Sequence, residues 1–242
     1  MSQVKLGDKN IPFIYQGNEL LYPNPVKDGL VLYYDFKGVT NNNRWKKYPR
    51  DLSGNGLSAS LYNSAYNTEG SGYIDGLHFD GIDDFVSIPQ NPLAYQGKEK
   101  QKWTVSILAT IKDSYTSNKL LKGINNGLEV RISGGVYKAL NFIGSTSRLY
   151  LYSNSIVPVN EKCHITYSYN YVNKKNRIYI NGVLDSELII DDSKDKLEGM
   201  LSVLELSPNR DNVIHSLQIY NRILSEQEIQ HNYQLEKERW GL

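Results

Sequence analysis

Residues 176–187, NRIYINGVLDSE, decide the fold class, because they carry the sequence signature of a β-hairpin. Asn181-Gly182 separates two runs in which apolar and polar residues alternate. Both positions of the tightest hairpin turn need positive φ, which asparagine and glycine tolerate better than other residues. The stretch therefore predicts two antiparallel strands joined by a two-residue turn.

Runs of the same kind lie on both sides of this hairpin. Clusters of Gly, Asn, Asp and Ser separate them, which is typical of a β-sandwich rather than of alternating strands and helices. No internal repeat has a fixed period. Besides the hairpin, the clearest predicted strands are residues 29–36, 102–112, 127–133, 148–153, 162–172 and 200–206.

The C-terminal residues follow a helical pattern instead. Ser225 and Glu228 form a capping-box pair, and Ile229 begins a series of residues at helical spacing that continues through 232/233 and 235/236. These features predict one helix at about residues 225–238.

The first 25 residues form a predicted unit of their own. Residues 3–7, 11–16 and 19–23 are short strand candidates, separated by the turn sequences GDKN and QGN. Three such strands bury too little surface to be stable alone. We therefore expect residues 1–25 to be a docking segment, completed by the domain at 26–242 or by another protein.

Composition excludes several classes of partner and site. The 27 Lys and Arg residues nearly balance the 26 Asp and Glu residues, and no block of like charge could follow a nucleic acid backbone. Cys163 is the only cysteine, so we expect no internal disulfide and no cysteine-pair zinc site. No apolar run approaches the roughly 20 residues of a membrane span, and the N-terminus has no signal-peptide core.

Five motifs follow one another along the chain, and the last of them, IHSLQIYNRILSEQEI, is the most specific. Their order and spacing resemble laminin-G-like domains of the concanavalin A-like lectin/glucanase superfamily. The resemblance implies an all-β jelly-roll sandwich of two antiparallel sheets, in which the first and last strands are adjacent. The motifs lie at residues 29–36, 51–63, 76–89, 177–187 and 214–229.

The stretch VKLGDKNIPFIYQGNELLYP, residues 4–23, is similar to N-terminal segments of bacteriophage tail and baseplate proteins. This resemblance implies a virion component, made in the host bacterial cytoplasm without a signal peptide. Its partners would be other virion structural proteins, contacted through residues 1–25.

Catalytic motifs are missing from the sequence. Glucanases of the superfamily carry Glu-x-Asp-x-Glu on one strand, where residues i and i+2 point the same way. The chain contains no such triplet, and its clusters DGIDD and DDSKDKLE lie in turn-like segments. It also lacks G-x-S-x-G, H-E-x-x-H and the phosphate-binding loop motif. We therefore expect that the protein is not an enzyme. The alternative is a glycosidase whose two catalytic carboxylates are distant in the sequence and are brought together by the fold.

Residues 80–84, DGIDD, have two interpretations. As a corner between strands, Gly81 would supply positive φ, Ile82 would point inward and Asp84 would accept bonds from backbone amides. As a cation site, the corner would supply the oxygen ligands that calcium prefers.

The family resemblance implies the calcium site. Its ligands here would be Asp80, Asp83 and Asp84, with Asp211. The strand that usually adds acidic ligands instead carries His215 and Ser216, so the chain lacks those acidic ligands of the family pattern.

Sugar binding needs an aromatic face for the sugar ring and polar groups for its hydroxyls. Trp103 is expected in the core and Trp240 against the terminal helix, while His164 lies on a polar strand face where a histidine is usually solvated or locally hydrogen-bonded. The candidates for carbohydrate contact are Trp45, Tyr48, Tyr62, Tyr66, Tyr150 and Tyr152.

Three functions remain open at this stage. The first is a non-enzymatic virion protein whose lectin-like domain binds host cell-wall glycan or decorates the particle. The second is a free-standing lectin, and the third, disfavoured by the missing triplet, is a wall-polysaccharide hydrolase.

Overall fold

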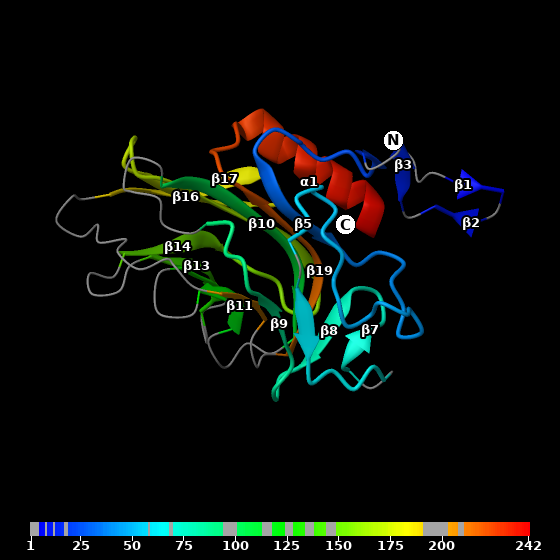
Figure 1. Cartoon of the computed structure of the whole chain (residues 1–242). Coiled ribbons are helices and arrows are strands. Elements are labelled where there is room, and N and C mark those ends of the chain that lie inside the picture. Colours follow the sequence, from blue (N-terminus) through cyan, green and yellow to red (C-terminus); the bar gives the residue numbers. More distant parts are fainter. Residues whose placement is uncertain are drawn as a thin grey trace.

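Two antiparallel sheets pack face to face in the computed structural model, and one helix lies outside them (Figure 1). This arrangement confirms the predicted all-β jelly-roll sandwich. The structure describes residues 5–7, 9–11, 13–16, 19–57, 59–67, 70–93, 101–112, 118–123, 128–133, 138–143, 149–190, 203–207 and 211–242.

The larger sheet has the order β17-β16-β15-β10-β19-β8-β7, and β5 also pairs with β19. Because β5 and β19 are the first and last strands of the sandwich, the predicted adjacency of first and last strands is confirmed. The bounds are β5 (Leu30–Asp35), β7 (Gly72–Tyr73), β8 (Leu77–Asp80), β10 (Lys102–Ile111), β15 (Lys162–Asn170), β16 (Lys175–Ile180), β17 (Val183–Ile189) and β19 (Asp211–Tyr220).

The smaller sheet has the order β14-β13-β12-β11-β18-β9-β6. Four strands, β6, β7, β11 and β13, were not predicted, because they are short or lack clear alternation of apolar and polar residues. The predicted strand at 200–206 is confirmed only at β18, since residues 200–202 lie outside the described part. The bounds are β6 (Ser60–Tyr62), β9 (Phe85–Ile88), β11 (Asn118–Gly123), β12 (Leu128–Ile132), β13 (Lys138–Ile143), β14 (Leu149–Ile156) and β18 (Leu204–Leu206).

The core lies between the sheets and is filled by alternate residues of the long central strands. Val105 and Ile107 of β10 point into it, as do Ile165 and Tyr167 of β15. Trp103 is buried there, as predicted.

The predicted hairpin joins β16 to β17. Ile180 pairs with Val183, and the turn residues Asn181 and Gly182 have φ of 50° and 79°. A Cβ atom on Gly182 would lie 2.6 Å from Oε1 of Gln230, so the turn packs closely against the terminal helix.

The helix α1 (Glu226–Trp240) lies across the outer face of the larger sheet (Figure 1). Both bonds of the predicted capping box between Ser225 and Glu228 are present. Trp240, expected to pack against the helix, is instead its last residue and is buried with its ring 4.7 Å from the ring of His215 on β19.

The outer face of the larger sheet is polar yet buried, because α1 covers it. His164 is 1% exposed and its ring lies 5.8 Å from the ring of Tyr233, so the first of the two expected states, a solvated ring, was wrong. Burial lowers the pKa of His164 to about 4, which keeps the ring neutral. The strand alternation was predicted correctly, but it does not reveal which face a helix covers.

The N-terminal residues form two small hairpins. The first, β1 (Lys5–Leu6) with β2 (Lys9–Asn10), projects from the molecule in Figure 1. The second, β3 (Ile14–Gln16) with β4 (Glu19–Tyr22), lies close to the sandwich, where Phe13 and Tyr15 pack against Tyr33 and Leu52. Part of the predicted docking segment therefore contacts the following domain, while the division at residue 25 stays a prediction. None of the helices in the described residues is long and apolar enough to cross a bilayer.

Candidate carbohydrate site

The loop after β5 is held in place by a series of hydrogen bonds. The Tyr73 hydroxyl donates to the carbonyl oxygen of Lys46 at 2.7 Å, and its backbone N–H donates to Oδ1 of Asn41 at 2.8 Å. Within the loop, the N–H of Tyr48 donates to the carbonyl oxygen of Trp45 at 2.8 Å. These bonds fix the backbone that carries Trp45 and Tyr48.

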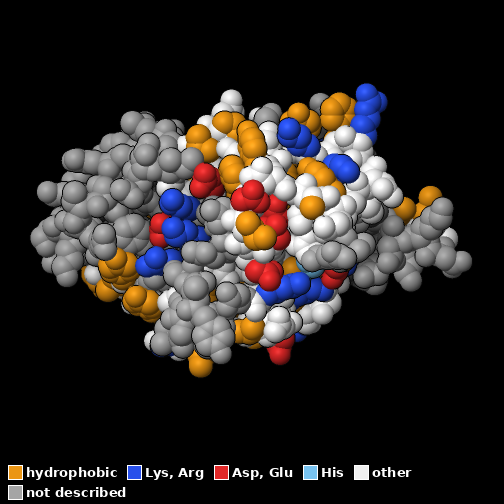
Figure 2. All heavy atoms as spheres, turned by 90° about the horizontal axis from the view of Figure 1, so that it is seen from below, with side chains coloured by type: hydrophobic (Ala, Val, Ile, Leu, Met, Phe, Trp, Pro, Cys, Tyr) orange, Lys and Arg blue, Asp and Glu red, His pale blue; other side chains and the backbone are white. Residues whose placement is uncertain are grey.

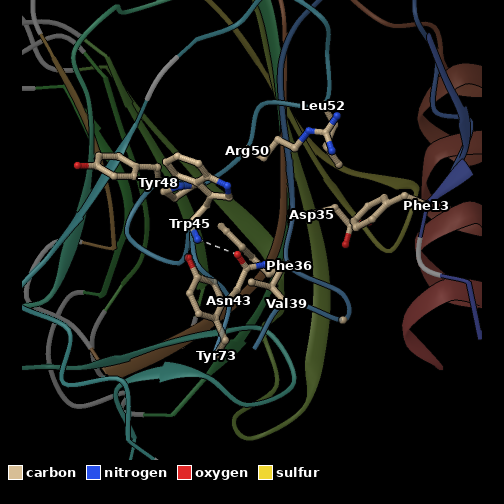
Figure 3. Close-up of a pocket in the computed structure, with 12 residues that line it drawn as sticks. Phe13, Asp35, Phe36, Val39, Asn43, Trp45, Tyr48, Arg50, Leu52 and Tyr73 are labelled. Atoms are coloured by element: carbon tan, nitrogen blue, oxygen red, sulfur yellow. Dashed lines mark hydrogen bonds between the residues drawn. The ribbon is translucent and has the colours of Figure 1, made fainter. Parts of the chain in front are cut away.

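Trp45 and Tyr48 are 62% and 51% exposed, and both border two adjoining hollows. One hollow has a volume of about 340 Å³ and the other about 410 Å³. Figure 3 shows the first hollow, with Trp45 and Tyr48 on one side, Phe13 and Asp35 toward α1, and Arg50 between them. The structure therefore brings two of the six predicted sugar-contact residues into one concave site.

Arg50 and Phe13 complete this site, although sequence analysis did not select them. Arg50 borders both hollows, and its guanidinium carbon lies 4.6 Å from the ring centroid of Tyr15. Phe13 lies 32 positions before Trp45 in the sequence (45 − 13) and reaches the hollow only through the packing of the N-terminal hairpin. The basic and aromatic run RWKKYPR was the available signal for Arg50.

The carboxylate of Asp35 lines the first hollow but already has its partners. Oδ1 accepts a bond from the N–H of Lys37 at 2.8 Å. Oδ2 accepts from the Tyr33 hydroxyl at 3.0 Å and from Nε of Arg239. Burial and the charge of Asp35 raise the pKa of the Tyr33 hydroxyl well above its usual value, so it stays a donor.

The carboxylate of Asp51 lines the second hollow, and both of its oxygens also accept hydrogen bonds within the protein. Oδ1 accepts from the N–H groups of Tyr33 and Ser53, at 3.1 and 2.9 Å. Oδ2 accepts from the N–H of Leu57 at 3.0 Å and from the Ser53 hydroxyl at 2.9 Å. Asp51 therefore organises the wall of the hollow.

The other predicted aromatic residues lie elsewhere. Tyr66 is half-buried, with Nζ of Lys46 4.3 Å from its ring centroid. Tyr62 is stacked on Phe85 at 4.9 Å beside the acidic corner. Tyr150 and Tyr152 stack on each other on β14, at the opposite edge of the smaller sheet from β6. The six residues thus do not form one surface.

The acidic corner follows β8, on the underside of the molecule in Figure 1. Figure 2 views that side and shows acidic side chains gathered near its middle. One ligand oxygen each from Asp80, Asp83 and Asp84 lies within 4.8 Å of the others. Gly81 has φ of 82°, as expected, whereas Ile82 is 75% exposed, so the expectation that it points inward was wrong. The tight turn directs Ile82 away from the core.

Asp84 is the buried member of this group. Its Oδ2 accepts bonds from the Ser71 hydroxyl at 2.8 Å and from the N–H of Asp80 at 3.1 Å. Its Oδ1 is buried without a hydrogen-bond partner. Burial raises the pKa of Asp84, and the charges of Asp80 and Asp83 act in the same direction. The corner therefore serves the structural role expected of it and also presents one unsatisfied oxygen.

Comparison with known families agrees with this architecture. A laminin-G-like family model, described as the concanavalin A-like lectin/glucanases superfamily, matches residues 80–230, more than half of the 242 residues. The chain belongs to this superfamily. A search of curated proteins gave no match.

Several solved structures share the superfamily fold. They include the binding domain of botulinum neurotoxin serotype D (TM-score 0.65, 18% identity, 87% of this chain and 53% of that chain). A neurotoxin DC binding domain in complex with rat synaptotagmin II gives a TM-score of 0.61 at 15% identity, covering 86% of this chain and 52% of that chain. Trypanosoma rangeli sialidase in complex with sialic acid gives 0.59 at 15% identity, covering 86% and 33%. The chain thus spans about half of the toxin domains and a third of the sialidase. At these identities the likeness concerns the fold alone.

The predicted fourth calcium ligand, Asp211, lies on the strand next to the acidic corner. Asp211 of β19 is paired with Asp80 of β8 but is outside the group of three carboxylates. His215 and Ser216, farther along β19, are buried beneath α1. Ser216 donates to Glu236 at 2.9 Å, so it serves the helix rather than the acidic corner.

Proposed function

We propose that this chain is a non-enzymatic carbohydrate-binding protein whose ligand occupies the hollows beside Trp45 and Tyr48. The observation that carries the proposal is the pairing of two exposed aromatic side chains with concave, partly polar walls. An aromatic ring can stack on the apolar face of a sugar, while Asn43 and Arg50 offer hydrogen bonds to its hydroxyls.

The fixed loop backbone supports a binding role. Because its hydrogen bonds already hold the loop, less conformational entropy is lost when a ligand binds. Tyr and Trp side chains also supply large contact areas with few rotatable bonds. The loop therefore has the features of a preorganised binding surface.

The absence of catalysis is part of the proposal. Retaining glycosidases need two carboxyl groups about 5 Å apart that both reach the substrate. The carboxylates that line the hollows, Asp35 and Asp51, have both oxygens engaged in bonds within the protein. We expect no release of reducing ends from any polysaccharide that the protein binds.

The test is binding of the purified protein, multimerised on beads, to a panel of bacterial wall polysaccharides. Multimerisation gives weak sites the avidity needed for detection. Trp45→Ala and Tyr48→Ala should each weaken binding about tenfold or more, as expected for a buried aromatic contact. Tyr152→Ala is the matched control, since Tyr152 is 45% exposed and lies on β14. Equal losses in all three variants, or no binding to any saccharide, would contradict the proposed site.

We also propose that the chain is a bacteriophage tail or baseplate component, docked through its N-terminal segment. Support comes from the resemblance of residues 4–23 and from the way β1 and β2 project from the sandwich. Because Phe13 lines the hollow and Tyr15 contacts Arg50, deletion of residues 1–25 would damage the sugar site as well.

The sharper variant removes residues 1–10 alone. Antibodies against the purified protein should label phage particles that carry the full chain and should not label particles assembled with the truncated chain. Sugar binding of the truncated protein should stay unchanged. Equal labelling of both particle types would place the docking contact elsewhere, and no labelling of either would favour a free-standing lectin.

A second candidate function is calcium binding at the acidic corner, through Asp80, Asp83 and Asp84. The observation that favours it is the buried Oδ1 of Asp84, which has no partner within the protein. Calcium binds carboxylate oxygens in flexible geometry, so it would satisfy this atom and offset the repulsion among the three carboxylates. Exposed Tyr62 lies beside the corner, since its neighbour Asn63 donates to the carbonyl oxygen of Asp83 at 3.0 Å.

A further inference from the structure

The loop that carries the proposed sugar site is basic. Between residues 44 and 50, the sequence RWKKYPR places four cationic residues around Trp45 and Tyr48 and includes no acidic residue. Arg44 lies over the indole of Trp45, with its guanidinium carbon 5.1 Å from the ring centroid. Arg50 lies in the wall that the two hollows share.

These cations are not neutralised by neighbouring carboxylates. In the part of the chain that the structure describes, no acidic side chain lies within ion-pair distance of Arg44, Lys47 or Arg50. Lys46 differs from them, because its Nζ already donates a hydrogen bond within the protein, to the carbonyl oxygen of Asn41 at 2.8 Å.

The acidic residues of the hollows do not cancel this charge. Asp35 is paired with Arg239 behind the wall. Asp51 accepts bonds from three backbone N–H groups and one hydroxyl. The charge of Asp35 is therefore compensated by Arg239, whereas Asp51 keeps one negative charge, so Arg44, Lys47 and Arg50 leave a positive excess around the hollows.

We infer that the ligand is an acidic glycan, whose sugar ring stacks on Trp45 or Tyr48 while its anionic group binds Arg50. This inference rests on the proposed carbohydrate-binding function and names the chemical class of its ligand. The planar guanidinium group donates two parallel hydrogen bonds to a carboxylate or phosphate, and Arg44 and Lys47 add positive charge at the rim.

A nucleic acid would also use aromatic and basic side chains. The glycan is favoured because the chain has a net charge of +1 and because the basic cluster is confined to one loop of seven residues. A nucleic acid backbone is normally followed by a longer positive groove.

The test compares an immobilised polyuronic acid with the same polymer after chemical reduction of its carboxyl groups. The wild-type protein should bind the acidic polymer about tenfold or more tightly than the reduced one, as expected for charge-assisted hydrogen bonds. Arg50→Gln should abolish this preference, because it should weaken binding of the acidic polymer about tenfold more than binding of the reduced polymer. Lys102→Gln is the matched control, because it removes one exposed positive charge at the start of β10. A teichoic acid, which carries phosphate, provides a second acidic probe.

Each outcome separates the two proposals. Equal binding of both polymers that Trp45→Ala abolishes would leave the carbohydrate site standing and overturn its acidic specificity. Binding of neither polymer and of no teichoic acid would overturn the acidic specificity, and failure of the whole polysaccharide panel would overturn the carbohydrate site too. Competition by single-stranded DNA at equal charge concentration would overturn the glycan assignment in favour of a general polyanion site.

Discussion

The guanidinium of Arg239, near the end of α1, is hydrogen-bonded through Nε to the buried carboxylate of Asp35 on the first strand of the sandwich. The rings of Phe13 and Tyr22 lie 5.0 and 5.5 Å from the same guanidinium. One ion pair thus joins the N-terminal hairpin, the first strand and the terminal helix. It also fixes the wall of the hollow that Asp35 lines.

Breaking this ion pair should be costly. Arg239→Met leaves the carboxylate of Asp35 buried without its counter-ion, so we expect the free energy of unfolding to fall by about 3–5 kcal/mol. Urea denaturation measures this change. Lys237→Met on the exposed side of the same helix should cost less than about 1 kcal/mol. The double variant Asp35→Asn with Arg239→Met should recover part of the loss; equal stability of the Arg239 and Lys237 variants would contradict the role of the pair.

Stability should depend on the protonation of Glu236, which lies fully buried between α1 and β19. Burial, and then the charge of Asp35, raise its pKa from 4.5 to about 8. The folded protein therefore holds a proton that the unfolded chain releases above pH 4.5, so stability falls as the pH rises from about 4.5 to 8. Glu236→Gln should remove this dependence, and its stability relative to wild type should increase between pH 5 and 8.

Glu228 provides the matched control for that experiment. The hydrogen bond from Arg222 lowers the pKa of Glu228 to about 2. Its contribution to the free energy of unfolding is therefore fully present above pH 4.5 and is lost as the pH falls toward 2. Glu228→Gln should thus shift stability by a constant amount between pH 5 and 8. Parallel pH profiles for wild type and Glu236→Gln would contradict the raised pKa of Glu236.

Calcium at the acidic corner should stabilise the fold by mass action. A ligand at 100 times its dissociation constant adds about 2.7 kcal/mol, which raises the melting temperature of a domain of this size by several degrees. Asp83→Asn should abolish the increase without disturbing the turn, because Asp83 is exposed whereas Asp84 accepts two structural bonds. Asp28→Asn at a distant exposed site should leave it intact. An unchanged melting curve and no heat of binding in calorimetry would contradict the metal site.

The turn at Gly182 should report how closely the hairpin packs against α1. In Gly182→Ala the new Cβ atom meets Tyr233 at 2.9 Å as well as Gln230, in addition to the strain of φ 79°. Gly241 has φ of 70° with no atom within 4 Å, so Gly241→Ala isolates the conformational cost, about 1 kcal/mol. Gly182→Ala should therefore lose clearly more unfolding free energy in urea than Gly241→Ala. Equal losses would mean that the helix shifts freely.

Local patterns were sufficient for much of the fold. The Asn181-Gly182 hairpin, the Ser225 cap and the long alternating strands depend on interactions within a few residues, so the sequence predicts them. Strands such as β11 and β13 escaped prediction because they are formed by pairing with neighbours rather than by their own alternation.

The sites required the tertiary structure. The sequence pointed to the acidic corner and to six aromatic candidates, with the loop of Trp45 as the best of them. Only the structure shows that Trp45 and Tyr48 border the same hollows while the other four lie elsewhere. Arg50 and Phe13 joined the site only when the N-terminal hairpin packed beside the loop.

The sequence by itself determined that this is an antiparallel β-sandwich closed by one helix, because alternation, turn chemistry and capping act over short distances along the chain. Only the tertiary structure decided that the polar face carrying His164 is buried and that Asp35 meets Arg239, 204 residues away. Contacts between distant segments depend on how the sheet curves and where α1 lies, and no local pattern in the sequence encodes them.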